Sequence, residues 1–312
     1  MNKKIQKCLL GFGLTSMILL STFHTCCAQE AGYFDHYYLQ PVMINPGATG
    51  FNGDHEFLAA YKLNYTDFPG APRTFTALYN GSFAEKVGLG FQVLSDHVGV
   101  TQLFHAQLNY AYKFIFNNAI VGVGLSTGLQ NFRVTDTQND PQIDPTDPLL
   151  NEAIDGYLLF DGSAGAYAEI ENKFIFGISF PNVVKQRISE IEGDVHLDLK
   201  SFPYAVHFGY RHEVKNYNFQ IEPSITVKNL RYSPFLVDLN LKFSFLDEQL
   251  VGGLGYTIGD DNKASLLLGT RLDNLRFYYS YDVSIGTLQQ FNNGSHEFTL
   301  LYRMPAKAPA SE

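Results

Sequence analysis

The feature that most constrains this chain is a two-residue alternation of aromatic and polar side chains, which is clearest over residues 202–211. One parity carries large apolar residues, namely Phe202, Tyr204, Val206, Phe208 and Tyr210. The other parity carries small or polar residues, namely Pro203, Ala205, His207, Gly209 and Arg211. A strand sorts these residues onto two faces, whereas a helix of 3.6 residues per turn does not. The stretch therefore predicts a strand with one apolar and one polar face.

Residues 217–228 repeat the pattern, with Glu222 and Lys228 on the polar face. Burying a carboxylate and an ammonium in a water-soluble core is costly unless they are paired. In a membrane barrel the apolar face meets lipid and the polar face lines the lumen. The 26 Phe and 19 Tyr also suit lipid-facing strands with interfacial girdles. A secreted β-sandwich with an aromatic core is the alternative that composition alone leaves open.

The first residues are typical of an export signal. A basic start with Lys3, Lys4 and Lys7 precedes an apolar run from Leu9 to Leu20 that is too short for a membrane anchor. Cleavage after Ala28 makes residues 1–28 a signal peptide. A lipidated Cys26 or Cys27 is the alternative, although Phe-His-Thr is a poor approach to such a site.

All three cysteines lie in this signal, so we expect neither a disulfide nor a thiolate site in the mature chain. The net charge is −9, and removal of the signal lysines makes it more negative, which argues against a nucleic-acid partner. No later stretch approaches the roughly 20 continuous apolar residues of a spanning helix. A β-barrel is therefore the only predicted way across a membrane.

Strand-like segments fill residues 56–304 and number about fourteen, as in an all-β outer-membrane barrel with antiparallel strands. They are placed at 56–66, 73–83, 87–96, 99–115, 119–133, 160–170, 173–180, 201–213, 217–228, 234–246, 249–258, 263–272, 275–285 and 296–304. Tight turns alternate with longer connections, the longest being 134–159 and 181–200. Tight turns face the periplasm in such barrels and long loops face outside.

The inward parity carries charges that predict a network in the lumen: Lys62, Lys113, Arg211, Glu222, Asp238, Lys242, Arg271, Asp282, Glu297 and Arg303. The alternation is weakest at 87–96, 119–133 and 249–258, which are crowded with glycines that mark bends or close backbone approach.

Residues 29–55 precede the first strand and carry two prolines and an Asn-Pro step, which predict an irregular N-terminal arm. The arm either plugs the lumen or lies at the periplasmic rim. The Pro/Ala-rich residues 305–312 are predicted to be a disordered tail.

No convincing active site is found, and we expect neither an enzyme nor a cofactor. Ser295 and His296 raise the idea of an outer-membrane hydrolase, but a loop-to-strand junction explains them better. The scattered histidines do not form a metal site. The loop 135–148 carries Asp140 and Asp144 among prolines; it lacks the ligand spacing of a calcium loop, and a solvated, stiff loop that contacts a protein partner is the better interpretation.

Three local signatures lie between Tyr38 and Lys113. The first runs from Tyr38 to Gly50 and contains Asn45 and Pro46, followed by Gly47. The second comprises Gly70, Pro72, Arg73 and Thr74. The third joins Gly88-Leu89-Gly90, Asp96-His97-Val98-Gly99 and Tyr110-Ala111-Tyr112-Lys113. Together they resemble the PorP/SprF family of outer-membrane proteins, whose first motif is Asn-Pro-Ala-x-x-Gly, with Gly47 here in place of the alanine, and whose second is Gly-x-Pro-Lys/Arg-Thr, here without the tryptophan that often precedes it.

The resemblance implies a component of the type IX secretion and gliding machinery of Bacteroidetes, placed in the outer membrane and surrounded by its lipid. It implies as partners a secreted protein or adhesin, bound through its C-terminal domain, and periplasmic and lipoprotein parts of the machine. A channel for small solutes or hydrophobic molecules is the alternative function.

The motif residues have a structural interpretation beside the functional one. Asn45, Pro46 and Gly50 belong to a docking arm or to a fixed plug, of which the plug is favoured. Gly70, Pro72, Arg73 and Thr74, with Asp96 and Gly99, either contact a partner or form turns that set the strand register; the turn interpretation is favoured.

Overall fold

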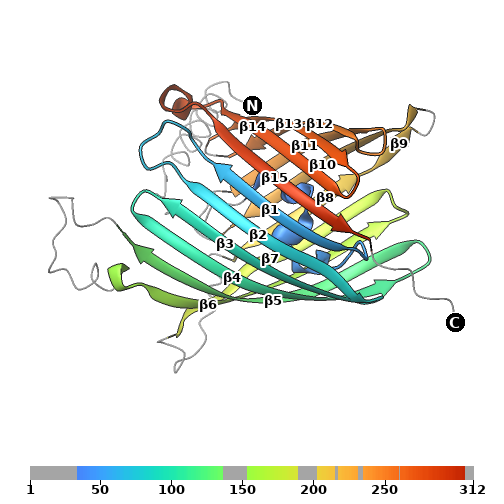
Figure 1. Ribbon diagram of the computed structural model, residues 1–312, viewed down its shortest axis with the longest axis horizontal. Coiled ribbons are helices and arrows are strands. Elements are labelled where there is room, and N and C mark those ends of the chain that lie inside the picture. Colours follow the sequence, from blue (N-terminus) through green and yellow to red (C-terminus); the bar gives the residue numbers. More distant parts are fainter. Residues whose placement is uncertain are drawn as a thin grey trace, which may run out of the picture.

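The computed structural model describes residues 34–135, 153–188, 202–214, 217–230, 235–259 and 261–305. In this part of the chain the strands hydrogen-bond in sequence order into one antiparallel sheet (Figure 1). The ring closes because the first strand pairs with the last, from His55 against Met304 to Leu63 against His296. The predicted barrel of 14 antiparallel strands is thereby confirmed.

The strands follow the segments that the alternation predicts. Their bounds are β1 His55–Leu63, β2 Arg73–Ala84, β3 Val87–Val98, β4 Thr101–Ile115, β5 Ala119–Val134, β6 Tyr157–Ile170, β7 Phe174–Arg187, β8 Tyr204–Tyr210, β9 His212–Val214, β10 Phe219–Asn229, β11 Phe235–Phe245, β12 Leu250–Ile258, β13 Lys263–Leu272, β14 Leu275–Ser284 and β15 Ser295–Met304. The predicted strand 201–213 is interrupted at Arg211, so β8 and β9 are two parts of one strand, and both pair with β10.

The two faces of the wall have the predicted polarity. Large apolar side chains on the outer face are exposed, as at Leu108 (59%) and Leu125 (62%), where lipid covers them. On the inner face Glu297 and Thr299 are fully buried. Since charged side chains are seldom fully buried unless they are paired, the inner face needs a partner inside the barrel.

Strand β7 continues beyond the predicted end at residue 180. The pairing with β6 shifts register between Gly162 and Ala164, which accommodates the buried Pro181 without ending the strand. The Asn182 N–H, released from the ladder, donates to Ser163 Oγ at 2.9 Å. A proline therefore bends this strand where the sequence suggested that it stops.

The barrel has two distinct ends. At the turn end, short connections such as Glu171-Asn172 and Asp247-Glu248 adopt positive φ, which suits tight hairpins. The loop end holds the longer connections, including 64–72 and 285–294. Among the described residues, no helix has the length and apolar character needed to cross a bilayer.

Candidate functional site

The candidate site is the described part of the N-terminal arm, residues 34–54, together with the barrel wall that it contacts. The arm folds into three short 3-10 turns, η1 Asp35–Tyr38, η2 Pro41–Met43 and η3 Pro46–Ala48. Proline begins the second and third turns, where its missing N–H costs nothing. Asn45 caps the third, because its Oδ1 accepts the Gly47 N–H at 2.9 Å.

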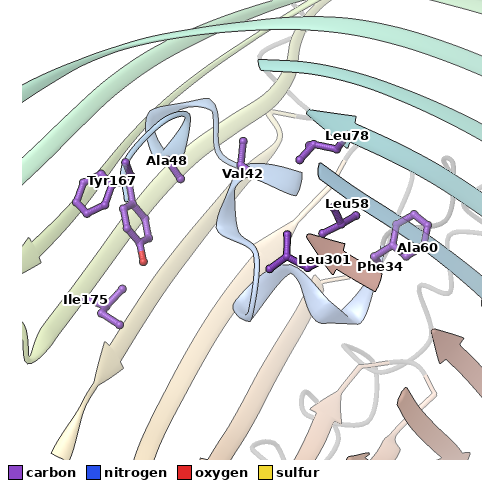
Figure 2. Close-up of a cluster of buried hydrophobic side chains, with 10 residues drawn as sticks. Phe34, Val42, Ala48, Leu58, Ala60, Leu78, Tyr167, Ile175 and Leu301 are labelled. Atoms are coloured by element: carbon purple, nitrogen blue, oxygen red, sulfur yellow. The ribbon is translucent and has the colours of Figure 1, made fainter. Parts of the chain in front are cut away.

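The arm lies inside the barrel, where its apolar side chains share one core with the inner wall (Figure 2). The arm contributes Phe34, Val42, Ala48 and Phe51 to this cluster, and the wall contributes Leu58, Ala60, Leu78, Tyr167, Ile175 and Leu301. A second, smaller cluster packs Tyr38 and Leu39 of the arm against Val251, Leu267 and Tyr278. Since the wall residues belong to strands around the ring, the arm crosses the lumen.

The arm lies directly on the wall at four inward glycines, which we call the glycine seat: Gly88, Gly122, Gly124 and Gly165. The first three meet backbone atoms of the arm, and Gly165 meets the Asn45 side chain. A Cβ atom on Gly124 would lie 2.2 Å from Pro46 O, and one on Gly88 would lie 2.1 Å from Thr49 O. A larger residue at either position therefore displaces the arm. The crowded glycines at 87–96 and 119–133 do mark close approach, whereas Gly252 in β12 meets nothing within 4 Å.

The motif residues Asn45, Pro46 and Gly50 all contact the glycine seat. Asn45 Nδ2 donates to Ala166 O at 2.9 Å, which ties the third turn to β6. Gly50 has φ of +63°, a left-handed conformation that favours glycine. Its N–H donates to Asn80 Oδ1 at 2.6 Å, and its carbonyl accepts from Lys113 Nζ at 2.8 Å.

The other end of the arm is bound through charged groups. Glu297 on β15 accepts the backbone N–H groups of Asp35 at 2.7 Å and of His36 at 2.9 Å. Lys62 on β1 lies 2.6 Å from Asp35 Oδ2 and 3.7 Å from Glu297 Oε2. One carboxylate and one ammonium of the wall thus hold the first turn, at the loop end of their strands.

Two ionisable groups of this turn lie in the arm, outside the membrane-spanning strands. Burial opposes the ionisation of Asp35, but the positive charges of Lys62, Lys263 and Lys228 together outweigh it and lower the pKa of the carboxyl. Burial, helped by Lys62 and opposed by Asp35, lowers the pKa of His36 to about 3. His36 is therefore neutral at pH 7, and its ring meets Glu297 and Thr299 as a hydrogen-bonding group, with Nδ1 2.8 Å from Thr299 Oγ1.

A third attachment joins the arm to the opposite wall. The Tyr37 hydroxyl donates to Asp238 on β11. Lys228 on β10 lies 2.6 Å from the same carboxylate, and its ammonium sits 4.6 Å from the centre of the Tyr37 ring. Tyr37 is thereby held by a hydrogen bond and a cation–π contact.

The remaining described motif residues meet at the loop end. Gly70 O accepts the Gly99 N–H at 2.9 Å, and both glycines have positive φ. The buried Thr74 hydroxyl donates to the buried Asp96 carboxylate at 2.6 Å. The first bond joins the β1–β2 connection to the β3–β4 turn, and the second joins strand β2 to strand β3 beside them, so that Asp96 is a strand residue and not the predicted turn residue.

The other members of these motifs have simpler roles. Pro72 accepts the Asn64 N–H at 3.0 Å, and the exposed Arg73 begins β2. The loop residues Asp140 and Asp144 lie outside the described residues.

The hydrolase idea finds no geometric support. Ser295 is buried in the wall and its Oγ accepts the Tyr65 N–H at 3.1 Å. His296, as the next residue of the strand, points to the other face and hydrogen-bonds Tyr279 there at 2.9 Å. In the described part of the chain, no group of three His, Cys, Asp or Glu residues is placed to hold a metal.

Sequence comparison gives the family of the chain. The family model described as type IX secretion system membrane protein PorP/SprF matches residues 26–302. The chain belongs to the PorP/SprF family. This PorP/SprF protein is accordingly an outer-membrane component of the type IX secretion machinery. No curated protein matches it in sequence.

Solved structures resemble this PorP/SprF protein in fold. The Pseudomonas putida toluene transporter TodX aligns with a TM-score of 0.52 and 8% identity, over 90% of this chain and 96% of that chain. A Pseudomonas aeruginosa FadL homologue aligns with a TM-score of 0.48 and 11% identity, over 83% of this chain and 92% of that chain. The Acinetobacter baumannii outer membrane protein Omp33 aligns with a TM-score of 0.47 and 7% identity, over 80% of this chain and 98% of that chain. At these identities the likeness concerns the barrel alone.

Proposed function

We propose that this PorP/SprF protein assists the export or the surface attachment of a partner protein, such as a large adhesin, that it recognises through the partner's C-terminal domain. The observation that carries the proposal is the arm, which crosses the lumen and is bound to β15, β1, β6, β10 and β11. A lumen occupied by the protein's own chain suits a protein that holds its partner at the ends of the barrel.

The connections at the two ends supply the contact surfaces in this proposal. The long connections between β5 and β6 and between β7 and β8, the first of which carries Asp140 and Asp144, contact the exported domain. The turn end contacts the periplasmic and lipoprotein parts of the machine. The loop-end contacts of Gly70, Thr74, Asp96 and Gly99 give the loops a fixed base, because hydrogen bonds join them.

The test is a deletion strain complemented with variants, followed by proteomics of the intact cell surface. We expect the deletion to remove at least one exported protein with a C-terminal secretion domain from the surface, and the wild-type gene to restore it. A double variant Asp140→Asn, Asp144→Asn is expected to restore less of this surface protein than the wild-type gene does. An unchanged surface proteome in the deletion strain contradicts the proposal.

A channel for small solutes or hydrophobic molecules is the competing function. Planar bilayers distinguish the two, because a solute channel passes robust single-channel current with the arm in place. The partner-holding function predicts no such current from the wild-type protein.

A further inference from the structure

The first turn of the arm joins a buried group of charges that do not balance. Among the described residues, this group has three carboxylates, Asp35, Asp282 and Glu297, against the single ammonium of Lys62. Asp282, near the end of β14, is 2% exposed, and neither of its carboxylate oxygens makes a hydrogen bond of good geometry. When all three carboxyls are ionised, two negative charges remain without a cation, an arrangement that is costly in a buried site.

Neighbouring cations do not restore the balance. Lys228 is committed to Asp238 at 2.6 Å. Lys263 is turned to the Tyr65 ring, 5.0 Å from its centre. The His36 ring is engaged with Thr299, with Nδ1 2.8 Å from Thr299 Oγ1.

A small cavity of about 20 Å³ lies beside these carboxylates, between the arm and strands β11–β14. Its lining contains oxygen-bearing side chains from both sides, among them Asp35, Asp238, Asn240, Ser265, Ser280 and Asp282. The buried hydroxyl of Ser280 has no hydrogen-bond partner, which is a second sign of a missing neighbour. A volume of this size holds one water-sized particle.

We propose that this cavity binds a single Ca²⁺ ion, held by the carboxylates of Asp35 and Asp282 and by the hydroxyl of Ser280. Calcium prefers carboxylate, hydroxyl and amide oxygens, which are the donors that face the cavity. Its double charge equals the excess of the three carboxylates over the one ammonium. Because Asp35 belongs to the arm and Asp282 to the wall, the ion fastens the arm to the barrel.

The test uses the full mature protein in detergent, stripped of metal with EDTA and then titrated with Ca²⁺ while the melting temperature is followed. At a hundredfold excess over Kd we expect the melting temperature of the wild type to rise by roughly 5 °C. Asp282→Asn is expected to abolish this rise and, in EDTA, to melt above the wild type, because it removes an uncompensated charge. Ser280→Ala is expected to need several-fold more Ca²⁺ for the same rise.

Asp161→Asn is the matched control. Asp161 on β6 is also a fully buried carboxylate, but its Oδ2 lies 2.9 Å from His105 Nε2 and it does not line this cavity. Its variant is expected to keep the calcium response. If Asp282→Asn fails to fold, the proposal is tested by two other measurements. These are the higher Ca²⁺ concentration that Ser280→Ala needs and the binding of one Ca²⁺ ion per wild-type protein.

Three results overturn the proposal. The first is a wild type that binds no Ca²⁺ or responds to it no more than Asp282→Asn does. The second is an equal response to Mg²⁺ or Na⁺ at matched ionic strength, which indicates general screening. The third is stabilisation by acid without any calcium response, which indicates that a proton neutralises the carboxylates.

Discussion

Substituting Gly124 by alanine tests whether the glycine seat holds the arm. The added Cβ would lie 2.2 Å from Pro46 O and 2.4 Å from Pro46 C, whereas ordinary contact begins at 3.4 Å. The arm must therefore retreat by about 1.2 Å, since β5 is held by ladders on both sides and cannot move as easily. Overpacking of this kind costs about 1–3 kcal/mol of unfolding free energy. The retreat also weakens the bond from Asn45 to Ala166, which is 2.9 Å long.

Two measurements on the detergent-solubilised protein follow from this. Urea unfolding gives the free-energy loss, and hydrogen exchange with mass spectrometry reports the amides of residues 45–50, which should exchange faster. Gly252→Ala is the control, because its Cβ would meet nothing within 4 Å. We expect its effect to stay within about 0.5 kcal/mol. Equal losses in the two variants, with unchanged exchange in the arm, would refute the role of the seat.

Three further predictions concern the charges, the turns and the lumen. Lys62→Met, measured by urea unfolding without added divalent cations, is expected to cost about 3 kcal/mol because it leaves buried carboxylates unpaired. Lys86→Met in an exposed turn should have little effect, and equal losses would contradict this reasoning. Thr74→Val removes the hydroxyl that donates to Asp96 and is expected to cost about 1–3 kcal/mol in the same assay; no loss would show that the bond contributes nothing. Deletion of residues 34–52 is expected to produce step currents in planar bilayers that the wild type does not pass, and equal currents would show that the arm leaves the lumen open.

Most of the barrel could be predicted from the sequence, because each strand faces two different environments. The apolar face meets lipid all round the ring, so Leu108 and Leu125 obey the same two-residue pattern. The exception at Pro181 arises because a bulge accommodates a residue that usually ends a strand. The two-residue alternation predicts which face a side chain lies on, but it does not predict a local bulge.

The arm could be predicted far less well. Its turns have no period, and its partners lie far away in sequence, as with the bond from Asp35 N to Glu297, 262 residues apart. The inward glycines at 88, 122 and 124 did indicate a close approach, but they did not say which segment approaches. Asp238 was predicted to face the lumen, but nothing in the sequence indicated that Tyr37 is its partner.

The attachment of Asp35 and His36 to Glu297 has a consequence for biogenesis. The anchor for the earliest described turn stands on the final strand, so the earliest part of the chain cannot reach its binding site until the last part has been delivered. Contacts of such long sequence separation form late and slowly. Binding of the first turn is therefore the last step of assembly. A chain truncated before β15 lacks Glu297 and cannot bind this turn.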